Sequence, residues 1–154
     1  MAPATRKAEA ANAKEASRKA ELAMRERRYD AALVQYTVAI EAEPRNHTFY
    51  ANRSGAHAAK GSFKEALLDA DKCIELKGDR SEGYSRRGAA YAGLEKYSDA
   101  QASYERGLQL EPSSNHIKKE LDKLSLRRYR QRLLAGNRCA LQWSSRRWPC
   151  PPLL

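Results

Sequence analysis

The residues best suited to catalysis or metal binding are three histidines and three cysteines, and they are widely separated in this 154-residue chain. They are His47, His57, His116, Cys73, Cys139 and Cys150. The histidines have no serine, cysteine or carboxylate constellation around them, and the cysteines form neither a C-x-x-C motif nor a zinc-type spacing. The sequence also lacks a glycine-rich phosphate loop. We therefore expect a protein that is not an enzyme and that has neither a metal site nor a cofactor.

Charge is the second chemical feature, and it is concentrated near the C-terminus. The net charge is +10, and residues 115–154 alone contain ten Lys/Arg and two Asp/Glu. Basic residues interleaved with aromatic ones can neutralise phosphates and stack on bases. Residues 127–147, together with Trp148, are therefore a candidate surface for nucleic acid or another acidic partner. The alternative, which we favour, is a solvated helix followed by a segment without a selected function.

The elements that hold these side chains follow a 34-residue interval. Alanine recurs at this step, as do an aromatic residue, an aliphatic residue and a helix-stopping residue. The four series are Ala32, Ala66, Ala100; Tyr29, Phe63, Tyr97; Ile40, Ile74, Leu108; and Pro44, Gly78, Pro112. A fixed period of this size is typical of stacked helical repeats. Because one repeat cannot bury its apolar face alone, stacking creates a binding surface rather than a catalytic pocket.

With the recurring alanine at position 20, three units follow an N-terminal extension of residues 1–12. They span residues 13–46, 47–80 and 81–114. Each unit predicts two helices, at 13–27 and 31–43, at 47–60 and 63–77, and at 81–94 and 97–110. Gly61 is expected to end a helix in the left-handed conformation, and Ser62 with Glu65 is expected to form a capping box.

Small and bulky residues alternate in the expected packing. Position 8 of the units holds Ala20, Ser54 and Gly88, which allow close approach of two helices. The gaps between successive pairs are expected to be filled by Tyr36, Tyr50, Tyr84 and Tyr104. Cys73 occupies the repeat position that holds Ala39 and Gly107 in the other two units, so we expect it to fill a small space between helices. Arg53 and Arg87, at position 7, are expected to cover apolar surface with their long side chains.

A closing helix is expected after the third unit, over residues 115–135. Ile117, Leu121, Leu124 and Leu133 recur there at helical spacing, and the other face is basic. Helical arrays need such a polar-faced terminal helix to cover their last apolar surface. No acidic residue and no periodicity follow Gly136, so residues 136–154 are expected to be a disordered basic tail. The predicted fold is therefore all-α, with three helix-turn-helix units and a capping helix.

The 34-residue phase, the position-20 alanines, the aromatic residues at position 17 and the terminal prolines resemble the tetratricopeptide repeat (TPR) over residues 13–135. The segments 50–54, 69–74 and 83–90 are similar to the three-repeat domains of stress-inducible, heat-shock-organising co-chaperones. The resemblance implies a right-handed α-solenoid whose concave groove binds an extended peptide. In that family the peptide is the acidic Glu-Glu-Val-Asp tail of a heat-shock chaperone. The expected function is thus that of a protein–protein interaction adaptor and co-chaperone.

The resemblance also implies a clamp that holds two carboxylates of the peptide with five side chains. Asn52 and Arg86 match the family's amide and arginine positions in the second and third repeats. Where the family has Lys, Asn and Lys, this chain has Ser17, Glu21 and Glu82. Glu82, four residues before Arg86, is expected to neutralise it in part.

Three basic residues lie on or beside the same face of the first repeat and are expected to compensate for the missing donors. The candidate groove residues are therefore Asn52, Arg86, Lys14, Arg18 and Arg25. Because the clamp is incomplete, the alternative is a TPR scaffold for a partner other than a chaperone. Nucleic-acid binding through the basic C-terminal segment is the third hypothesis.

Location is indicated by two features of the chain. No apolar run approaches the roughly 18 residues that span a bilayer. The first 16 residues are Ala-rich and charged and lack the apolar region of a secretory signal. We therefore expect a cytoplasmic protein without a membrane partner.

Overall fold

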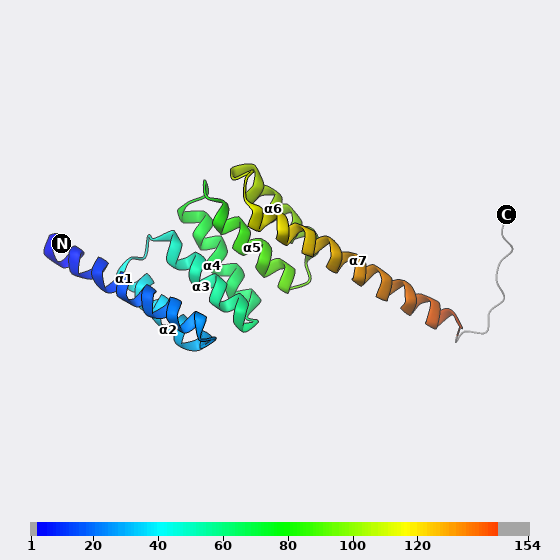
Figure 1. Ribbon diagram of the computed structural model, residues 1–154, viewed down its shortest axis with the longest axis horizontal. Coiled ribbons are helices and arrows are strands. Elements are labelled where there is room, and N and C mark those ends of the chain that lie inside the picture. The colour runs from blue at the N-terminus through cyan, green and yellow to red at the C-terminus, as the bar shows by residue number, and fades with distance from the viewer. Residues whose placement is uncertain (1–2, 145–154) are drawn as a thin grey trace.

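The computed structural model describes the backbone of residues 3–144 and the side chains of residues 8–134. The described chain forms seven α-helices and no strand, which confirms the all-α prediction (Figure 1). The helices are α1 (Pro3–Arg25), α2 (Tyr29–Ala42), α3 (His47–Lys60), α4 (Phe63–Leu76), α5 (Ser81–Gly93), α6 (Tyr97–Leu110) and α7 (Asn115–Ser144). None of these helices has the length and apolar character needed to cross a membrane.

The helices pair in sequence order and the pairs stack on one another. The pairs α1–α2, α3–α4 and α5–α6 make the three units, and each unit meets the next through α2–α3 and α4–α5 contacts. Helix α3 also touches α5, so the first helices of the second and third units are neighbours. Helix α7 packs on α6 and α5 and then extends beyond the array (Figure 1). The stacked repeat arrangement predicted from the 34-residue period is therefore present.

Two helix starts differ from the prediction. Helix α1 begins at Pro3, within the expected extension, because that stretch is rich in alanine and proline is well suited to the first turn of a helix. Helix α2 begins at Tyr29 rather than after Asp30. Arg27, with φ of 58°, makes the reversal between the two helices, so Tyr29 and Asp30 can join α2.

The end of α3 confirms one expected cap and corrects another. Gly61 adopts the left-handed conformation with φ of 89°. The Ser62 side chain makes no capping hydrogen bond at the start of α4, so the expected capping box is wrong. Instead the Ser62 and Gly61 amides donate to the carbonyls of His57 and Ala58. This is the Schellman arrangement, in which Ser62 is fixed by the helix that precedes it.

Small residues form the closest contacts of the core. Ala20, Ser54 and Gly88, at position 8 of the units, are all buried. A Cβ atom added to Gly88 would lie 2.7 Å from the ring of Tyr104, which shows how closely α5 and α6 approach. Tyr36 and Tyr104 are buried as expected, whereas Tyr50 and Tyr84 are only partly buried. Cys73 is fully buried, in agreement with its predicted packing slot.

The C-terminal helix covers the third unit but departs from the expected boundaries. Ile117 and Leu124 are buried against this unit, whereas Leu133, expected on the same face, is exposed. The helix continues to Ser144, so the expected disorder is wrong for residues 136–144. The stretch contains no proline, and a single glycine, Gly136, costs a helix only about 1 kcal/mol. Residues 145–154 lie outside the described part.

The close approach of Gly88 to the Tyr104 ring leads to a prediction about stability. Gly88→Ala should lower the free energy of unfolding by about 1–3 kcal/mol, because the added methyl group overlaps the buried Tyr104 ring. Gly55→Ala is the matched control, since its methyl group would meet only the movable end of the Arg86 side chain. Chemical denaturation of the two variants measures the difference. Equal stability of Gly88→Ala and the parent chain would contradict the packing described.

Candidate functional site: the inner face of the repeats

The first helices of the three units carry a set of polar side chains that we call the inner face. It consists of Glu21 on α1, Asn52 and Gly55 on α3, and Glu82 and Arg86 on α5. The 34-residue step places Asn52 and Arg86 at equivalent positions of successive units, and Glu21 and Gly55 likewise. Because α3 and α5 are neighbouring helices, the repeat brings these equivalent positions together.

Arg86 lies across Gly55. A Cβ atom built on Gly55 would be 2.9 Å from Nη1 of Arg86 and 3.2 Å from its Cζ atom. A larger residue at position 55 would therefore displace the guanidinium group. Gly55 follows Asn52 by three residues, which places both on the same side of α3. Arg86 therefore lies across the side of α3 that also carries the amide of Asn52.

Glu82 lies next to the arginine. Its Oε1 atom is 4.0 Å from Nη2 of Arg86, and the two side chains are 40% and 38% exposed. An ion pair this open to solvent contributes only about 0–1 kcal/mol to stability. The guanidinium of Arg86 therefore retains hydrogen-bond donors for a ligand, although the adjacent carboxylate lowers the local positive potential.

Glu21 brings a second carboxylate to this face from the first unit. The Ser17 hydroxyl donates to Oε1 of Glu21 at 3.4 Å. Burial raises the pKa of the Tyr36 hydroxyl, Glu21 raises it further, and Arg86 lowers it. Glu21 of the first unit and Arg86 of the third unit therefore both shift the pKa of the buried Tyr36 hydroxyl.

The charges of Glu82 and Arg86 also affect the buried thiol of Cys73. Burial raises the pKa of Cys73 to about 11, with Glu82 adding to the increase and Arg86 opposing it. The inner face therefore combines one arginine with two carboxylates instead of presenting a uniformly basic surface. Gly55 was not recognised as part of this face from the sequence. The sequence did contain a signal for this role: Gly55 is 34 residues after Glu21, so a glycine stands in the second unit where the first unit has a long side chain.

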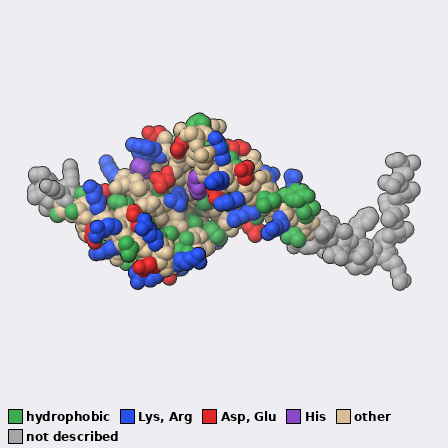
Figure 2. All heavy atoms as spheres, viewed as in Figure 1, with side chains coloured by type: hydrophobic (Ala, Val, Ile, Leu, Met, Phe, Trp, Pro, Cys, Tyr) green, Lys and Arg blue, Asp and Glu red, His purple; other side chains and the backbone are tan. Residues whose placement is uncertain are grey.

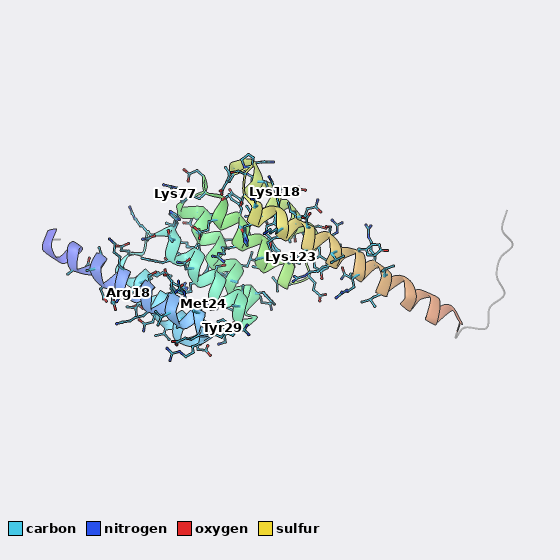
Figure 3. The ribbon with its side chains drawn as sticks, viewed as in Figure 1. Arg18, Met24, Tyr29, Lys77, Lys118 and Lys123 are labelled. Atoms are coloured by element: carbon cyan, nitrogen blue, oxygen red, sulfur yellow. The ribbon has the colours of Figure 1, made fainter. Side chains whose placement is uncertain are left out.

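The three basic residues predicted to compensate lie on α1. Lys14 and Arg25 are exposed, one turn before Ser17 and one turn after Glu21. Arg18 pairs with Glu15 at 3.1 Å and lines an outer cleft of about 570 Å³ with Leu22 and Val34. In Figure 3 it lies at the end of the array remote from Lys118 and Lys123 on α7. The Arg18 side chain is therefore paired with a residue of its own helix, and Lys14 and Arg25 remain candidates for the inner face.

Arg53, which follows Asn52 directly, has a structural role. Its Nε and Nη2 atoms donate to Asp69 at 2.8 and 2.7 Å, and Nη1 donates to Thr37 at 3.2 Å. The hydrogen bond to Asp69 raises the pKa of Arg53. Its guanidinium also lies over the Tyr50 ring, 5.7 Å from the centroid. Arg53 thus joins α2, α3 and α4, and it does so mainly through hydrogen bonds rather than by covering apolar surface as predicted.

Arg87 repeats this arrangement one unit later. It donates to the Ser103 hydroxyl at 3.3 Å, pairs with Asp71 at 3.7 Å and lies over the Tyr84 ring. Each of these arginines therefore contacts the second helix of its own unit and that of the preceding unit. Among the described residues no group of three His, Cys, Asp or Glu side chains is placed to hold a metal ion.

Comparison with known proteins agrees with the fold. Residues 81–114 match the family model described as the tetratricopeptide repeat. The chain is 43% identical over 106 residues to the Hsp70-Hsp90 organizing protein of Triticum aestivum, covering 69% of this chain and 18% of that protein. It spans less than half the length of the curated relatives that it matches.

Two solved structures are similar over most of their length. The first TPR domain of human RPAP3 is 33% identical with a TM-score of 0.71, and the match covers 75% of this chain and 91% of that domain. The first TPR of Spaghetti (RPAP3), bound to the HSP90 peptide SRMEEVD, is 32% identical with a TM-score of 0.70. That match covers 76% of this chain and 93% of the Spaghetti domain.

The two kinds of arginine predict opposite outcomes for the same substitution. Arg53→Met should lower the free energy of unfolding by about 3–5 kcal/mol, because it leaves the buried Asp69 carboxylate unpaired. Arg86→Met should change the free energy of unfolding by no more than about 1 kcal/mol, since its ion pair is exposed. Urea denaturation of both variants measures the contrast. Similar losses in the two variants would show that Arg86 is also a structural residue.

Proposed function

Since the chain belongs to the tetratricopeptide repeat family, as its residues indicated, we propose that it is a protein–protein interaction adaptor whose inner face binds the C-terminal peptide of a heat-shock chaperone. This is the function of a co-chaperone. The observation that carries the proposal is the position of Arg86 across Gly55, on the same side of α3 as Asn52. An amide and a guanidinium held on two packed helices form a fixed pair of donors for a carboxylate.

The relatives support this choice of partner. The Spaghetti domain is bound to a peptide that ends in Glu-Glu-Val-Asp, and the wheat relative is an organizing protein of Hsp70 and Hsp90. A C-terminal aspartate offers its main-chain and side-chain carboxylates within a few ångströms of each other. Asn52 and Arg86 would hydrogen-bond to one of them, and Lys14 and Arg25 would attract the peptide's remaining negative charge.

Two carboxylates of the inner face weaken this interaction. Glu21 and Glu82 stand where the resemblance implies hydrogen-bond donors to the peptide. Each lost charge-assisted hydrogen bond costs about 1.5–3 kcal/mol, and a like charge adds repulsion. Two such losses lower the affinity by about a hundredfold or more relative to a complete clamp. We therefore propose a weak, salt-sensitive peptide interaction.

A second candidate function follows from the same carboxylates. Glu21 and Glu82 would suit a partner that brings a Lys or Arg side chain next to a carboxylate. In that case the chain would be a TPR scaffold for a protein other than a chaperone. Under either alternative we propose a non-enzymatic adaptor, since binding of this kind uses hydrogen bonds and ion pairs and no cofactor. We also propose that the adaptor is cytoplasmic.

Peptide titration tests the proposed function. A fluorescent peptide ending in Glu-Glu-Val-Asp should bind the parent chain, and Arg86→Ala or Asn52→Ala should weaken binding at least about tenfold through loss of a carboxylate hydrogen bond. Arg106→Ala, an exposed arginine on α6, is the matched control and should leave the affinity unchanged. Fluorescence anisotropy measures the dissociation constants. Absence of binding at high micromolar concentration would reject the chaperone tail and favour the second candidate.

Replacing the two carboxylates should strengthen binding of the same peptide. Glu82→Lys and Glu21→Asn each remove a repulsion and supply a donor, so each should raise the affinity by about tenfold. Glu82→Gln, which removes only the charge, should give a smaller gain. The comparison of dissociation constants at low and moderate salt tests the electrostatic cause. Unchanged affinity in all three variants would show that neither carboxylate lies near the bound peptide.

A further inference from the structure

Helix α7 carries apolar side chains on the side that faces away from the repeats. Leu126, Tyr129 and Leu133 are 65%, 61% and 51% exposed. Their spacing of three and four residues places them along one side of the helix, and we call this row the outer stripe. Hydrophobic side chains gather beside Lys and Arg at the described end of α7 (Figure 2). A contiguous apolar row of this kind is a candidate interaction surface.

The stripe lies opposite the face that packs on the third unit. Leu124 is 3% exposed and belongs to the core cluster of α5, α6 and α7. Leu126 is two residues further along and therefore about 200° round the helix. Arg128 remains on the packed side, where its Nη1 atom donates to Oε1 of Gln101 at 2.5 Å. The repeats of the same chain thus hold the opposite side of α7 and leave the stripe uncovered.

The charges around the stripe have one sign. Arg127, Arg130 and Arg132 lie between and beside its apolar residues, and no acidic residue follows Asp122 in the sequence. In heptad terms Leu126 and Leu133 occupy a positions and Tyr129 a d position. Arg130 and Arg132 then occupy the flanking e and g positions. A narrow a/d row with charged flanks is the pattern of a helix that pairs with another helix.

We propose that the outer stripe is the docking seam for an acidic amphipathic α-helix of another protein. The partner helix would place apolar residues against Leu126, Tyr129 and Leu133. Its Glu or Asp residues at the flanking positions would pair with Arg130 and Arg132. Charge at e and g positions determines which helices pair, so the arginines provide the specificity and the stripe provides the apolar contact.

Three other occupants fit the stripe less well. A second copy of the chain would place Arg130 and Arg132 against arginines, which is unfavourable. Nucleic acid would leave Leu126 and Leu133 without a stacking or hydrogen-bonding role. A lipid surface requires a broad apolar face, whereas this row is narrow and interrupted by Arg130. Complementarity of charge and of apolar width therefore favours an acidic helix.

A designed helix provides the probe. It is a labelled peptide of about 28 residues with leucine at a and d and glutamate at e and g, whose glutamates disfavour pairing with itself. The matched peptide carries lysine at e and g. Anisotropy with the full chain should show binding of the glutamate peptide and none of the lysine peptide. The affinity should fall with added salt because the ion pairs are exposed.

Three sets of variants test the seam directly. Leu126→Ala combined with Leu133→Ala should weaken binding of the glutamate peptide at least about tenfold. Leu68→Ala, a 71% exposed leucine on α4, is the matched control and should leave it unchanged. Arg130→Glu combined with Arg132→Glu should reverse the preference, so that the lysine peptide binds. Circular dichroism checks that these surface variants keep the parent helicity.

Several results would overturn the proposal. Equal binding of the two peptides would contradict the proposed seam. Binding that is unchanged by the leucine substitutions would contradict it as well. The same would follow if a generic oligonucleotide, or vesicles of phosphatidylcholine with phosphatidylserine, bound in a leucine-dependent way while the glutamate peptide did not. Self-association that the leucine substitutions abolish would identify a second copy as the occupant. Because α7 is separate from the inner face, loss of this binding leaves chaperone-peptide binding intact.

Discussion

Close approach of paired helices is the constraint on which this structure depends. Ala32, Ala66 and Ala100 are all fully buried, and Gly88 brings α5 within contact of the Tyr104 ring. The 34-residue period exists because each unit must repeat this small-residue contact to stack on the next. The resulting array holds equivalent positions of successive first helices side by side. The positions of the residues on the inner face are therefore set by the packing of the helices, whether or not a ligand is bound.

The neighbouring residues Asn52–Arg53 and Arg86–Arg87 show how one array separates stability from binding. Arg53 and Arg87 turn towards second helices and join neighbouring units through Asp69, Thr37, Asp71 and Ser103. Asn52 and Arg86, one residue earlier, lie about 100° round the helix and remain available to a ligand. Removing Arg53 leaves the buried Asp69 carboxylate without its arginine. Removing Arg86 leaves an exposed carboxylate, which water can solvate.

The sequence predicted most of the fold because the signal was repeated. The period located all three units, and Gly61, Pro44 and Pro112 marked helix ends by local backbone chemistry. The C-terminal helix was less predictable, because it has no second copy to compare. Leu133 follows Leu124 by nine residues, which is about 180° round the helix, so it lies on the side away from the repeats and is exposed. Ser62 failed as a cap because the preceding helix end fixes its backbone.

The candidate site was predictable in part for the same reason. Asn52 and Arg86 were found through their place in the repeat. The contact of the Arg86 side chain with Gly55 joins two helices, and sequence spacing does not predict such a contact. Arg18 was expected near the groove, yet its side chain pairs with Glu15 and borders the outer cleft. Spacing along one helix gives the side on which a residue lies. It does not give the direction of a long flexible side chain.

The most direct measurement of the central claim is a nuclear magnetic resonance titration with a peptide ending in Glu-Glu-Val-Asp. The account predicts that the side-chain amide signals of Asn52 and the guanidinium signals of Arg86 shift first and most. Signals of α7 and of the outer cleft at Leu22 and Val34 should stay in place. Shifts confined to α7 or to the outer cleft, with Asn52 and Arg86 unmoved, would contradict the assignment of the inner face as the peptide site.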